Sequence, residues 1–450
     1  MKKLIVIILA IATVCVSCKK ERDTYSDYIS SVKVVPTDNA LRFKVEMVKA
    51  KECSPKVQVR IKGAEKWQTM PGEMALLLYP ETEYECRVVV GELAGEPVLF
   101  STGALPEEVP VYELTVDKGG PTDGYVLQWK ESAPGYMTLC TMDGKVVWYE
   151  SFDGGIRCAE YNKDSGRIVA LTGTVQIAPD VLTPRPATDV VVLDLEGNRY
   201  ASIKMSVENA QYPHHEMAGY GIDKMILNNH SHRTLDLSSV GGGADSEVWG
   251  DEIVLIDMNG QVAWRWDVLD HLDVVAASGY LPMNKLFDIV HMNSVAVDSE
   301  GNFYVSLLWI KEIWKIDGKT GDVLYRFGPH GDITMTAGYP VGGYHSIVIE
   351  EPDTFLVNNN SETMTDPTYG LRIKVNAASK TAECTLKVPL DTEYTSTTGG
   401  YFQILPDGKT YMFDTTQGKG CVFVDGDGSI LRVLKRKDTS YRAFYFDHLF

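Results

Sequence analysis

The sequence lacks the features of a helical protein or a nucleic-acid-binding protein. Beyond residue 28, no long segment sustains amphipathic helical periodicity, which argues against a helical bundle. Basic residues are in the minority, with 43 Lys and Arg against 61 Asp and Glu for a net charge of −18. The chain beyond the N-terminal region has no strongly basic run. Because phosphate binding needs clustered Lys and Arg, we expect no nucleic acid partner.

Cysteine is also scarce. Six cysteines follow Cys18, and no two of these six form a Cys-x-x-Cys pair, which argues against a cysteine-rich metal site. Their spacings are wide and irregular, which leaves any disulfides unassigned. Cys53 and Cys86 lie within one small predicted unit and are one candidate pair.

Long apolar runs are limited to the N-terminus. Lys2 and Lys3 precede an apolar stretch over residues 4–16, too short for a comfortable bilayer span, and Ser17-Cys18 then leads into a polar segment. A small residue before a cysteine at this junction resembles a bacterial lipoprotein signal, which predicts acylation of Cys18; the alternative is a plain secretory signal cut nearby. We expect a signal peptide over 1–18, a tether over 19–27, and an exported protein lipid-anchored in the cell envelope, in the periplasm or on the outer-membrane surface.

What the chain has in quantity is strand and turn residues, including 39 Gly, 23 Tyr and 8 Trp. Residues 28–105 alternate apolar and polar positions, and a Pro-containing corner precedes Tyr84 and a Val-rich strand. This pattern resembles the closing half of a fibronectin type III or immunoglobulin-like β-sandwich. A Pro-rich linker follows it.

The remainder of the chain repeats. One half-unit is an apolar strand, a turn of the Asp-x-x-Gly type and a second strand, with turn glycines at Gly144, Gly197, Gly260, Gly321 and Gly428 and a weaker copy over 371–386. A second strand–turn–strand half-unit lies between these copies. Two hairpins make one four-stranded unit, and six units over residues 110–450 predict a six-bladed β-propeller, which leaves no long exposed sheet edge. The insertion at 267–288 is expected to hold a short helix.

Three successive second half-units begin with histidine: His214 with His215, then His291, then His345. The strand that opens this hairpin is usually the innermost strand of a propeller blade, so the three positions would face one another across the channel. Structural histidines that bond a neighbouring blade are the simpler alternative. Three imidazoles also form a known zinc set, but Glu216 is the one carboxylate in this register, and we predict no metal.

These residues resemble a known family. The segments "HHEM", "HMNSVAVDSEGNFYVSLL" with the following "YRFG", and "YHSIVIEEPDTFLVNN" are similar to the bacterial aryl-sulfate sulfotransferases that work without PAPS, and the resemblance spans most of residues 110–435. It implies a six-bladed propeller with an N-terminal β-sandwich. It also implies a periplasmic enzyme that needs no cofactor and moves a sulfuryl group from a phenolic sulfate donor to a phenol acceptor through a sulfohistidine.

The resemblance also assigns roles. His345 matches the nucleophile, His291 matches the histidine of the His-x-Asn-Ser segment, and the His214–His215 pair matches an HHD-like segment in which we expect His215 to point inward. Neutral imidazole is a good nucleophile and, once sulfated, a good leaving group. The candidate substrate-binding residues are Asn293, Trp309, Tyr344, Asn359 and Lys311.

One position departs from the family. Trp309 stands where the family has an arginine that would hold the sulfuryl oxygens, and loss of one such donor costs about 2–4 kcal/mol of transition-state stabilisation. Lys311, Arg233 or Arg326 are alternative sources of the charge. The sequence therefore leaves three hypotheses: an active sulfotransferase, a non-catalytic ligand-binding propeller with relic histidines, and a metal-dependent hydrolase or lyase. The N-terminal unit could also mediate a homodimer.

Overall fold

The computed structural model describes residues 23–174, 186–205, 212–281, 283–286, 288–336, 343–416 and 419–450. The predicted signal peptide and Cys18 lie outside these ranges. Within them the chain is almost entirely strand, with one α-helix, α1 (Tyr25–Tyr28), and short 3-10 turns. The all-β prediction is confirmed. No helix in the described ranges is long and apolar enough to cross a membrane.

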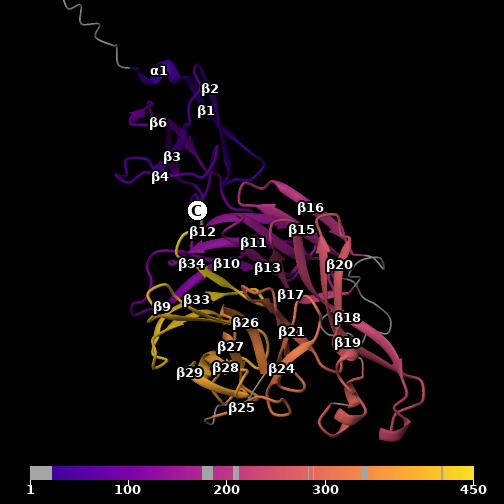
Figure 1. The fold of residues 1–450 in the computed structure, drawn as a ribbon. Coiled ribbons are helices and arrows are strands. Elements are labelled where there is room, and N and C mark those ends of the chain that lie inside the picture. The colour runs from indigo at the N-terminus through magenta and orange to yellow at the C-terminus, as the bar shows by residue number, and fades with distance from the viewer. Residues whose placement is uncertain are drawn as a thin grey trace, which may run out of the picture.

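The N-terminal unit holds two sheets, drawn in indigo in Figure 1. One sheet has the order β1-β2-β5, and the other has the order β4-β3-β6-β7, with β8 also paired to β6. Their strands are β1 (Ile29–Pro36), β2 (Phe43–Lys49), β3 (Lys56–Ile61), β4 (Gln68–Thr69), β5 (Met74–Ala75), β6 (Glu83–Val90), β7 (Leu93–Ala94) and β8 (Val98–Ser101).

The core of this unit follows from strand alternation. Tyr84, Cys86 and Val88 are buried on β6, while the residues between them are less buried. The hydroxyl of Tyr84 accepts a hydrogen bond from the Tyr79 backbone N–H at 2.7 Å, which fixes the corner before β6. Cys53 and Cys86 are both free thiols, as are the other described cysteines.

Residues 112–446 form six sheets of four or five strands within the described ranges. Their orders are β34-β10-β11-β12, β13-β14-β15-β16, β17-β18-β19-β20, β21-β22-β23-β24, β26-β27-β28-β29-β25 and β30-β31-β32-β33-β9. The strands are β9 (Tyr112–Asp117), β10 (Tyr125–Trp129), β11 (Gly135–Thr141), β12 (Val146–Phe152), β13 (Ile156–Asn162), β14 (Arg167–Thr172), β15 (Asp189–Asp194), β16 (Arg199–Lys204), β17 (Pro213–Tyr220), β18 (Lys224–Leu235), β19 (Ser246–Asp257), β20 (Val262–Asp267), β21 (Met292–Val297), β22 (Phe303–Leu307), β23 (Glu312–Ile316), β24 (Val323–Phe327), β25 (Thr334–Met335), β26 (Gly343–Glu351), β27 (Thr354–Asn360), β28 (Tyr369–Asn376), β29 (Thr381–Pro389), β30 (Tyr401–Ile404), β31 (Tyr411–Thr415), β32 (Gly420–Val424), β33 (Ile430–Arg436) and β34 (Phe444–Phe446).

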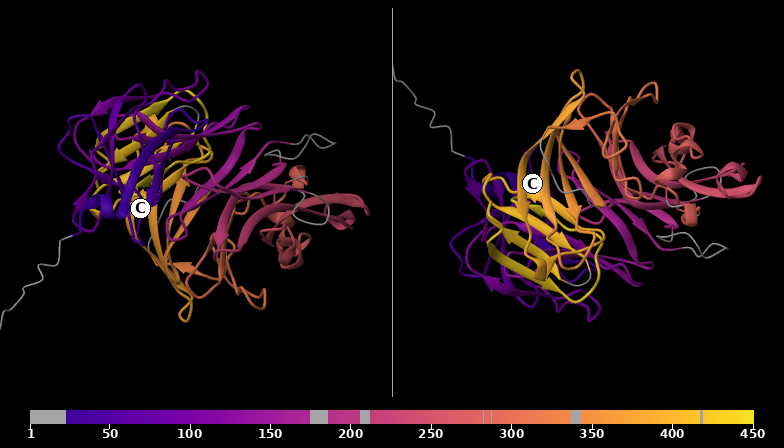
Figure 2. Two further views of the ribbon diagram at one scale, coloured as in Figure 1. Left: turned by 90° about the horizontal axis from the view of Figure 1, so that it is seen from above. Right: turned by 90° about the horizontal axis from the view of Figure 1, so that it is seen from below.

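The six sheets are arranged like the blades of a propeller. Seen from above and below, they follow one another around a centre in chain order (Figure 2). The first strand of each sheet contacts that of the next, from β13 through β17, β21, β26 and β30 to β34. We call these six the inner strands. Closure is interlaced, because β34 joins the sheet of β10 while β9 joins the sheet of β33.

The glycines at the repeated positions form the hairpin turns that their spacing predicts. Gly197, Gly260 and Gly428 each donate a backbone hydrogen bond to the carbonyl of the aspartate three residues earlier, and each has φ between 81° and 87°. A register shift follows each of these turns. A turn with a left-handed glycine followed by a bulge is a common hairpin connection, and glycine adopts this φ without a Cβ penalty.

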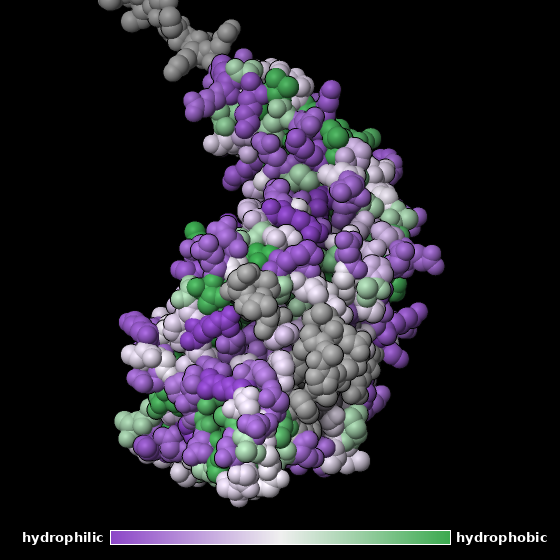
Figure 3. All heavy atoms as spheres, turned by 90° about the vertical axis from the view of Figure 1, so that its right-hand side faces the viewer, coloured by the Kyte–Doolittle hydropathy of each residue, from purple (hydrophilic) through white to green (hydrophobic). Residues whose placement is uncertain are grey.

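The segment 267–288 holds short 3-10 turns where a short helix was expected: Val268–Asp270, Ala276–Gly279 and Met283–Lys285. The N-terminal unit contacts the sheet of β12, where Arg42 pairs with Glu150 at 2.7 Å and the Asn39 amide bonds the Tyr149 carbonyl. The face seen in Figure 3 is hydrophilic over most of its area, with small separate hydrophobic patches. Charged and polar side chains of this kind keep a net-acidic protein dispersed in water.

Candidate active site

Bulges in three neighbouring inner strands position the histidines. The ladder register shifts between Pro213 and Met217 in β17, between Met292 and Ser294 in β21, and between His345 and Val348 in β26. At or beside each bulge one non-glycine residue has a left-handed backbone: His215 with φ 50°, His291 with φ 51° and Ser346 with φ 53°. Bulges re-aim side chains, and left-handed non-glycine residues gather at functional sites.

The predicted histidines come together. The ring centroids of His215 and His291 are 4.8 Å apart, and Tyr441 lies 5.3 Å from His215 and 6.4 Å from His345. The histidine cluster is defined here as His214, His215, His230, His291 and His345, all of them at most 9% exposed. Three strands that are distant in sequence thus deliver imidazoles to one buried place.

Hydrogen bonds fix two of these imidazoles. His345 Nδ1 lies 3.2 Å from the Gly343 carbonyl oxygen, and His291 Nδ1 contacts the Asp288 carboxylate. A carbonyl or a carboxylate can only accept, so Nδ1 carries the hydrogen in both rings. In the His345 ring, whose pKa is lowered by burial, this leaves Nε2 with its lone pair.

His214 and His230 share one carboxylate. His214 Nε2 and His230 Nδ1 each lie 3.0 Å from Asp251 Oδ1, and the Met292 backbone N–H donates to Asp251 Oδ2 at 2.6 Å. Burial opposes ionisation of Asp251, but the bonds from the two histidines hold the pKa of its carboxyl below the ordinary value. On its other side, His214 Nδ1 lies 2.7 Å from His215 Nδ1.

Burial keeps three histidines of the cluster neutral. Desolvation lowers the pKa of His214 to about 3 and that of His345 to about 4, and it lowers the pKa of His215 well below 6.5. Neighbouring imidazoles lower the last value further. At neutral pH these rings are therefore uncharged, which is the form that acts as a nucleophile or base.

His214, His230 and Asp251 also form a group of potential metal ligands, whose ligand atoms lie within 4.8 Å of one another. The two imidazole rings are stacked, with centroids 3.6 Å apart and planes 18° from parallel. A metal ion at about 2.0–2.1 Å from a nitrogen lies in the plane of its ring. Two rings stacked face to face cannot share an ion in both planes, so the geometry fits a hydrogen-bonded carboxylate better than a metal centre.

The predicted substrate-binding residues are spread more widely. Trp309 lies beside the cluster, with its ring centroid 5.3 Å from that of His291. Asn293 is fully buried on β21. The Tyr344 ring instead packs near Phe327, in the hydrophobic core between two sheets, and Asn359 is buried on β27 opposite Tyr344.

None of the three alternative cations proposed from the sequence is directed at the cluster. Lys311 forms an ion pair with Glu362, and its side chain is 39% exposed. Arg233 pairs with Asp267 and Asp270. Arg326 donates to the His271 carbonyl and lies over the Trp314 ring.

One cation that does lie beside the cluster is Arg442, which the sequence did not indicate. Its guanidinium pairs with Glu216 and donates to the Asn293 carbonyl at 3.0 Å, and it lies 5.1 Å from the Tyr441 ring centroid. Burial lowers the pKa of Arg442 to about 10, so it stays charged at neutral pH. On its other side is a cavity of about 240 Å³ between the inner strands, lined also by Glu160 and Tyr401.

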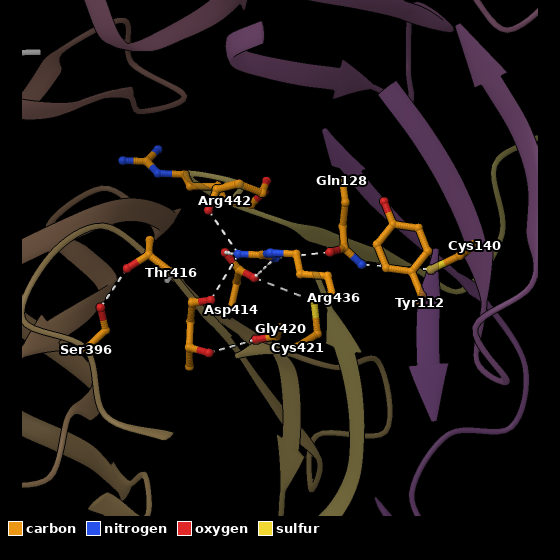
Figure 4. Close-up of polar contacts among 12 residues, drawn as sticks. Tyr112, Gln128, Cys140, Ser396, Asp414, Thr416, Gly420, Cys421, Arg436 and Arg442 are labelled. Atoms are coloured by element: carbon orange, nitrogen blue, oxygen red, sulfur yellow. Dashed lines mark hydrogen bonds and ion pairs between the residues drawn. The ribbon is translucent and has the colours of Figure 1, made fainter. Parts of the chain in front are cut away.

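A buried clamp holds the loop that carries Tyr441 and Arg442. The Arg436 guanidinium bonds Asp414 at 2.5 Å, Gln128 at 3.0 Å and the Ser440 carbonyl at 2.9 Å (Figure 4). These bonds join the last sheet to the first sheet and fix the start of the loop. Tyr441 thereby reaches His215 and His345 from the far end of the chain.

Sequence reasoning missed Asp251, Asp288, Tyr441 and Arg442. Asp288 lies three residues before His291, a spacing that could have drawn attention. Asp251 lies on β19 opposite His230 in register, a pairing that only the sheet reveals. Tyr441 and Arg442 follow the last recognisable repeat and carry no signal of their own.

Several solved structures are similar to the chain at low sequence identity. A protein of unknown function from Bacteroides caccae is 12% identical over 72% of this chain and 100% of that chain, with a TM-score of 0.42. The β-propeller domain of Myceliophteria thermophila Cps50 (Swd1) is 10% identical over 74% of this chain and 89% of that chain, with a TM-score of 0.39. A putative 6-phosphogluconolactonase from Bacteroides uniformis is 11% identical over 87% and 99%, with a TM-score of 0.39.

No curated protein sequence matches the chain. A family model described as arylsulfotransferase (ASST) matches residues 187–436, more than half of the 450-residue chain, and includes every member of the histidine cluster. This confirms the resemblance noted in the histidine-bearing segments. The chain belongs to the arylsulfotransferase family.

Proposed function

We propose that the protein is an aryl-sulfate sulfotransferase that moves a sulfuryl group between phenolic compounds through a sulfohistidine on His345. The observation that carries this proposal is the state of His345: buried, neutral, and bonded through Nδ1 to the Gly343 carbonyl, so that Nε2 keeps its lone pair. Membership of the arylsulfotransferase family supplies the class of reaction. The scaffold we propose is a six-bladed propeller over 110–450 that carries an N-terminal β-sandwich over 28–105.

The reaction has two halves. His345 Nε2 attacks the sulfur of the donor, and the bond between sulfur and the aryl oxygen breaks with its electron pair going to the oxygen. The phenolate leaves and is protonated by the imidazolium that the preceding turnover left or, in the first turnover, by water. The acceptor phenol oxygen then attacks the sulfohistidine. The S–N bond breaks, its electron pair returns to Nε2, and the phenol proton passes to a neighbouring imidazole.

Donors for the sulfuryl oxygens come from two residues next to the cluster. Among the described residues, the buried Asn293 Nδ2 and Ser346 Oγ have no hydrogen-bond partner. A buried donor without a partner is costly, and a bound anion would satisfy it. Together with the positive charge of Arg442 they take the place of the family arginine, while Trp309 offers a face for the phenol ring.

A second candidate is a non-catalytic ligand-binding protein with relic histidines. It is favoured by the substitution of Trp309 for the arginine and by the ion pairing of Arg442 with Glu216, which neutralises the nearest cation. Such a protein would bind an aromatic sulfate without transferring the group.

The test is transfer from p-nitrophenyl sulfate to a phenol acceptor by the purified protein. We expect release of p-nitrophenolate that depends on the acceptor, and a loss of roughly 10³-fold or more in His345→Ala, as for removal of a nucleophile. His330→Ala is the matched control, since His330 is exposed and outside the cluster. Mass spectrometry after incubation with donor alone would find a sulfuryl group on the His345 peptide. Ligand binding without transfer from any donor would favour the second candidate.

We also propose that the protein is exported, acylated at Cys18 and held by residues 19–27 at the bacterial cell envelope, and that the N-terminal unit mediates a homodimer. The observation behind the anchor is the Ser17-Cys18 junction after a short apolar run. Metabolic labelling with palmitate in the wild type and in Cys18→Ser tests the anchor, with label expected only in the wild type.

A further inference from the structure

A chain of hydrogen bonds runs from a buried carboxylate to the centre of the histidine cluster. Asp251 Oδ1 contacts His214 Nε2 at 3.0 Å, and His214 Nδ1 contacts His215 Nδ1 at 2.7 Å. Asp251 and His214 are each 1% exposed, so bulk solvent does not reach these bonds. The three groups come from β17 and β19, which are held in one sheet by β18.

The carboxylate determines where every hydrogen in this chain lies. Asp251 accepts hydrogen bonds, so His214 carries its hydrogen on Nε2. A second hydrogen on His214 would make a buried cation, which desolvation opposes. His214 Nδ1 is therefore an acceptor, and His215 must donate to it from Nδ1. Since His215 is neutral as well, its Nε2 carries no hydrogen and keeps its lone pair.

We propose that Asp251 and His214 are positioning residues that lock His215 in its Nδ1–H form, so that His215 Nε2 is the base that receives the proton of the acceptor phenol. This inference rests on the proposed function. The His215 ring is 4.8 Å from that of His291 and 5.3 Å from that of Tyr441, which in turn neighbours His345. The base is thus in the same buried place as the nucleophile.

The step balances as follows. The phenol O–H bond breaks as its oxygen forms a bond to sulfur, and the proton goes to His215 Nε2. The S–N bond to His345 breaks and its electron pair returns to His345. The imidazolium of His215 keeps its Nδ1–H bond to His214, and the negative charge of Asp251 stabilises it through that ring. The proton then passes to the phenolate that leaves in the next turnover.

His230 completes the arrangement. It donates to the same Asp251 oxygen at 3.0 Å and stacks on the His214 ring at 3.6 Å, while the Met292 backbone holds the second oxygen. Three donors and one stacked ring leave the carboxylate a single orientation. His214 therefore has a fixed partner on each side.

Asp251→Asn tests the relay, because its amide N–H₂ can donate where the carboxylate accepted. Donation to His214 Nε2 would move the His214 hydrogen to Nδ1, and His215 would then carry its hydrogen on Nε2 and lose its basic lone pair. We expect transfer to fall by roughly 10²–10⁴-fold, as when the aspartate of a serine-protease triad is changed to asparagine. The matched control is Asp257→Asn on the same strand, where the side chain accepts from exposed turn amides.

A second measurement does not depend on activity. Nitrogen-15 NMR of histidine-labelled protein distinguishes the two neutral forms of His215, with the signal assigned by comparison with His215→Gln. We expect the Nδ1–H form in the wild type and the Nε2–H form in Asp251→Asn. A wild type with His215 in the Nε2–H form would overturn the relay, even if Asp251→Asn failed to fold.

The outcomes separate the two proposals. If the wild type transfers no sulfuryl group but the hydrogen of His215 moves as expected, the relay stands and the sulfotransferase proposal fails. If the wild type is active and Asp251→Asn changes neither the rate nor the form of His215, the relay is wrong. Binding of one transition-metal ion per protein molecule by His214 and His230 would also overturn the relay.

Discussion

The outer and inner hairpins of the propeller-like sheets use left-handed backbone in opposite ways. Outer hairpins place glycine there at Gly197, Gly260 and Gly428, and the outer turn between β28 and β29 has Lys380 there instead. The inner strands place histidine and serine there, at His215 in β17, at His291 directly before β21 and at Ser346 in β26. An L-residue with this backbone costs roughly 1–2 kcal/mol, which glycine avoids.

This difference in left-handed residues distinguishes the requirements of the fold from those of the site. The outer hairpins with Gly197, Gly260 and Gly428 use the residue that adopts a left-handed turn without strain, so these turns can be recognised in the sequence. An inner strand accepts backbone strain and buried polar groups in order to hold imidazoles at one point. Removing strain inside should therefore stabilise the fold and harm transfer, whereas adding it outside should only destabilise.

The largest effect is expected where the two kinds of hairpin are joined. Arg436 ends the outer strand β33 and also holds the Ser440 carbonyl before Tyr441. Arg436→Met would leave the Asp414 carboxylate buried without its partner, at a cost of about 3–5 kcal/mol. Thermal and denaturant unfolding would measure the loss of stability.

The control is Arg372→Met, which removes the ion pair between Arg372 and Glu350. The side chains of these two residues are 33% and 31% exposed, respectively. A half-exposed pair of this kind contributes about 0–1 kcal/mol. Equal losses in the two variants would show that burial does not distinguish the pairs, and that the clamp is not what joins the last sheet to the site.

Acid should destabilise the inner region next most strongly. The pKa of His345 is about 4 in the folded protein against 6.5 ordinarily, so the unfolded chain binds more protons between these values. Stability is complete above about pH 6.5 and falls as the pH drops towards 4, by on the order of 3 kcal/mol for this one ring. His345→Gln removes the titration, and its unfolding midpoint should fall less than that of the wild type between pH 7 and pH 5. Parallel curves for the two proteins would contradict the assignment.

The smallest effect has the opposite sign. Ser346→Gly relieves the strain at φ 53° and removes a buried hydroxyl that has no partner among the described residues, so we expect stability to rise by about 1 kcal/mol. Transfer from p-nitrophenyl sulfate should fall in the same variant, because the hydroxyl next to His345 is lost. Unfolding and transfer assays on one preparation would show both changes.

Gly428→Ala supplies the opposite case in an outer turn. Its φ is 83°, and a Cβ there would lie 2.4 Å from the Pro389 carbonyl oxygen, so stability should fall by about 2 kcal/mol with little change in the transfer rate of the folded fraction. If both glycine changes shifted stability in the same direction, backbone strain would not separate inner from outer hairpins.

The same division explains how far the sequence could be interpreted. The turn glycines and alternating strands predict the sheets, and the repeated position of His215, His291 and His345 predicts their convergence. Asp251 could not be found because its partners His214 and His230 meet it only through strand pairing. The sequence could not show that Lys311 pairs with Glu362 rather than facing the site. Tyr344 faces the core because its neighbour His345 faces the site.

The interlaced closure has a consequence for the order in which the protein is made. Strand β34 completes the first sheet, and Tyr441 and Arg442, just before it, complete the site. A ribosome that has already synthesised His214, His291 and His345 has therefore not yet produced every residue of the candidate site. If the proposed function is correct, a product truncated before Tyr441 should lack transfer activity, because it would lack both Tyr441 and Arg442.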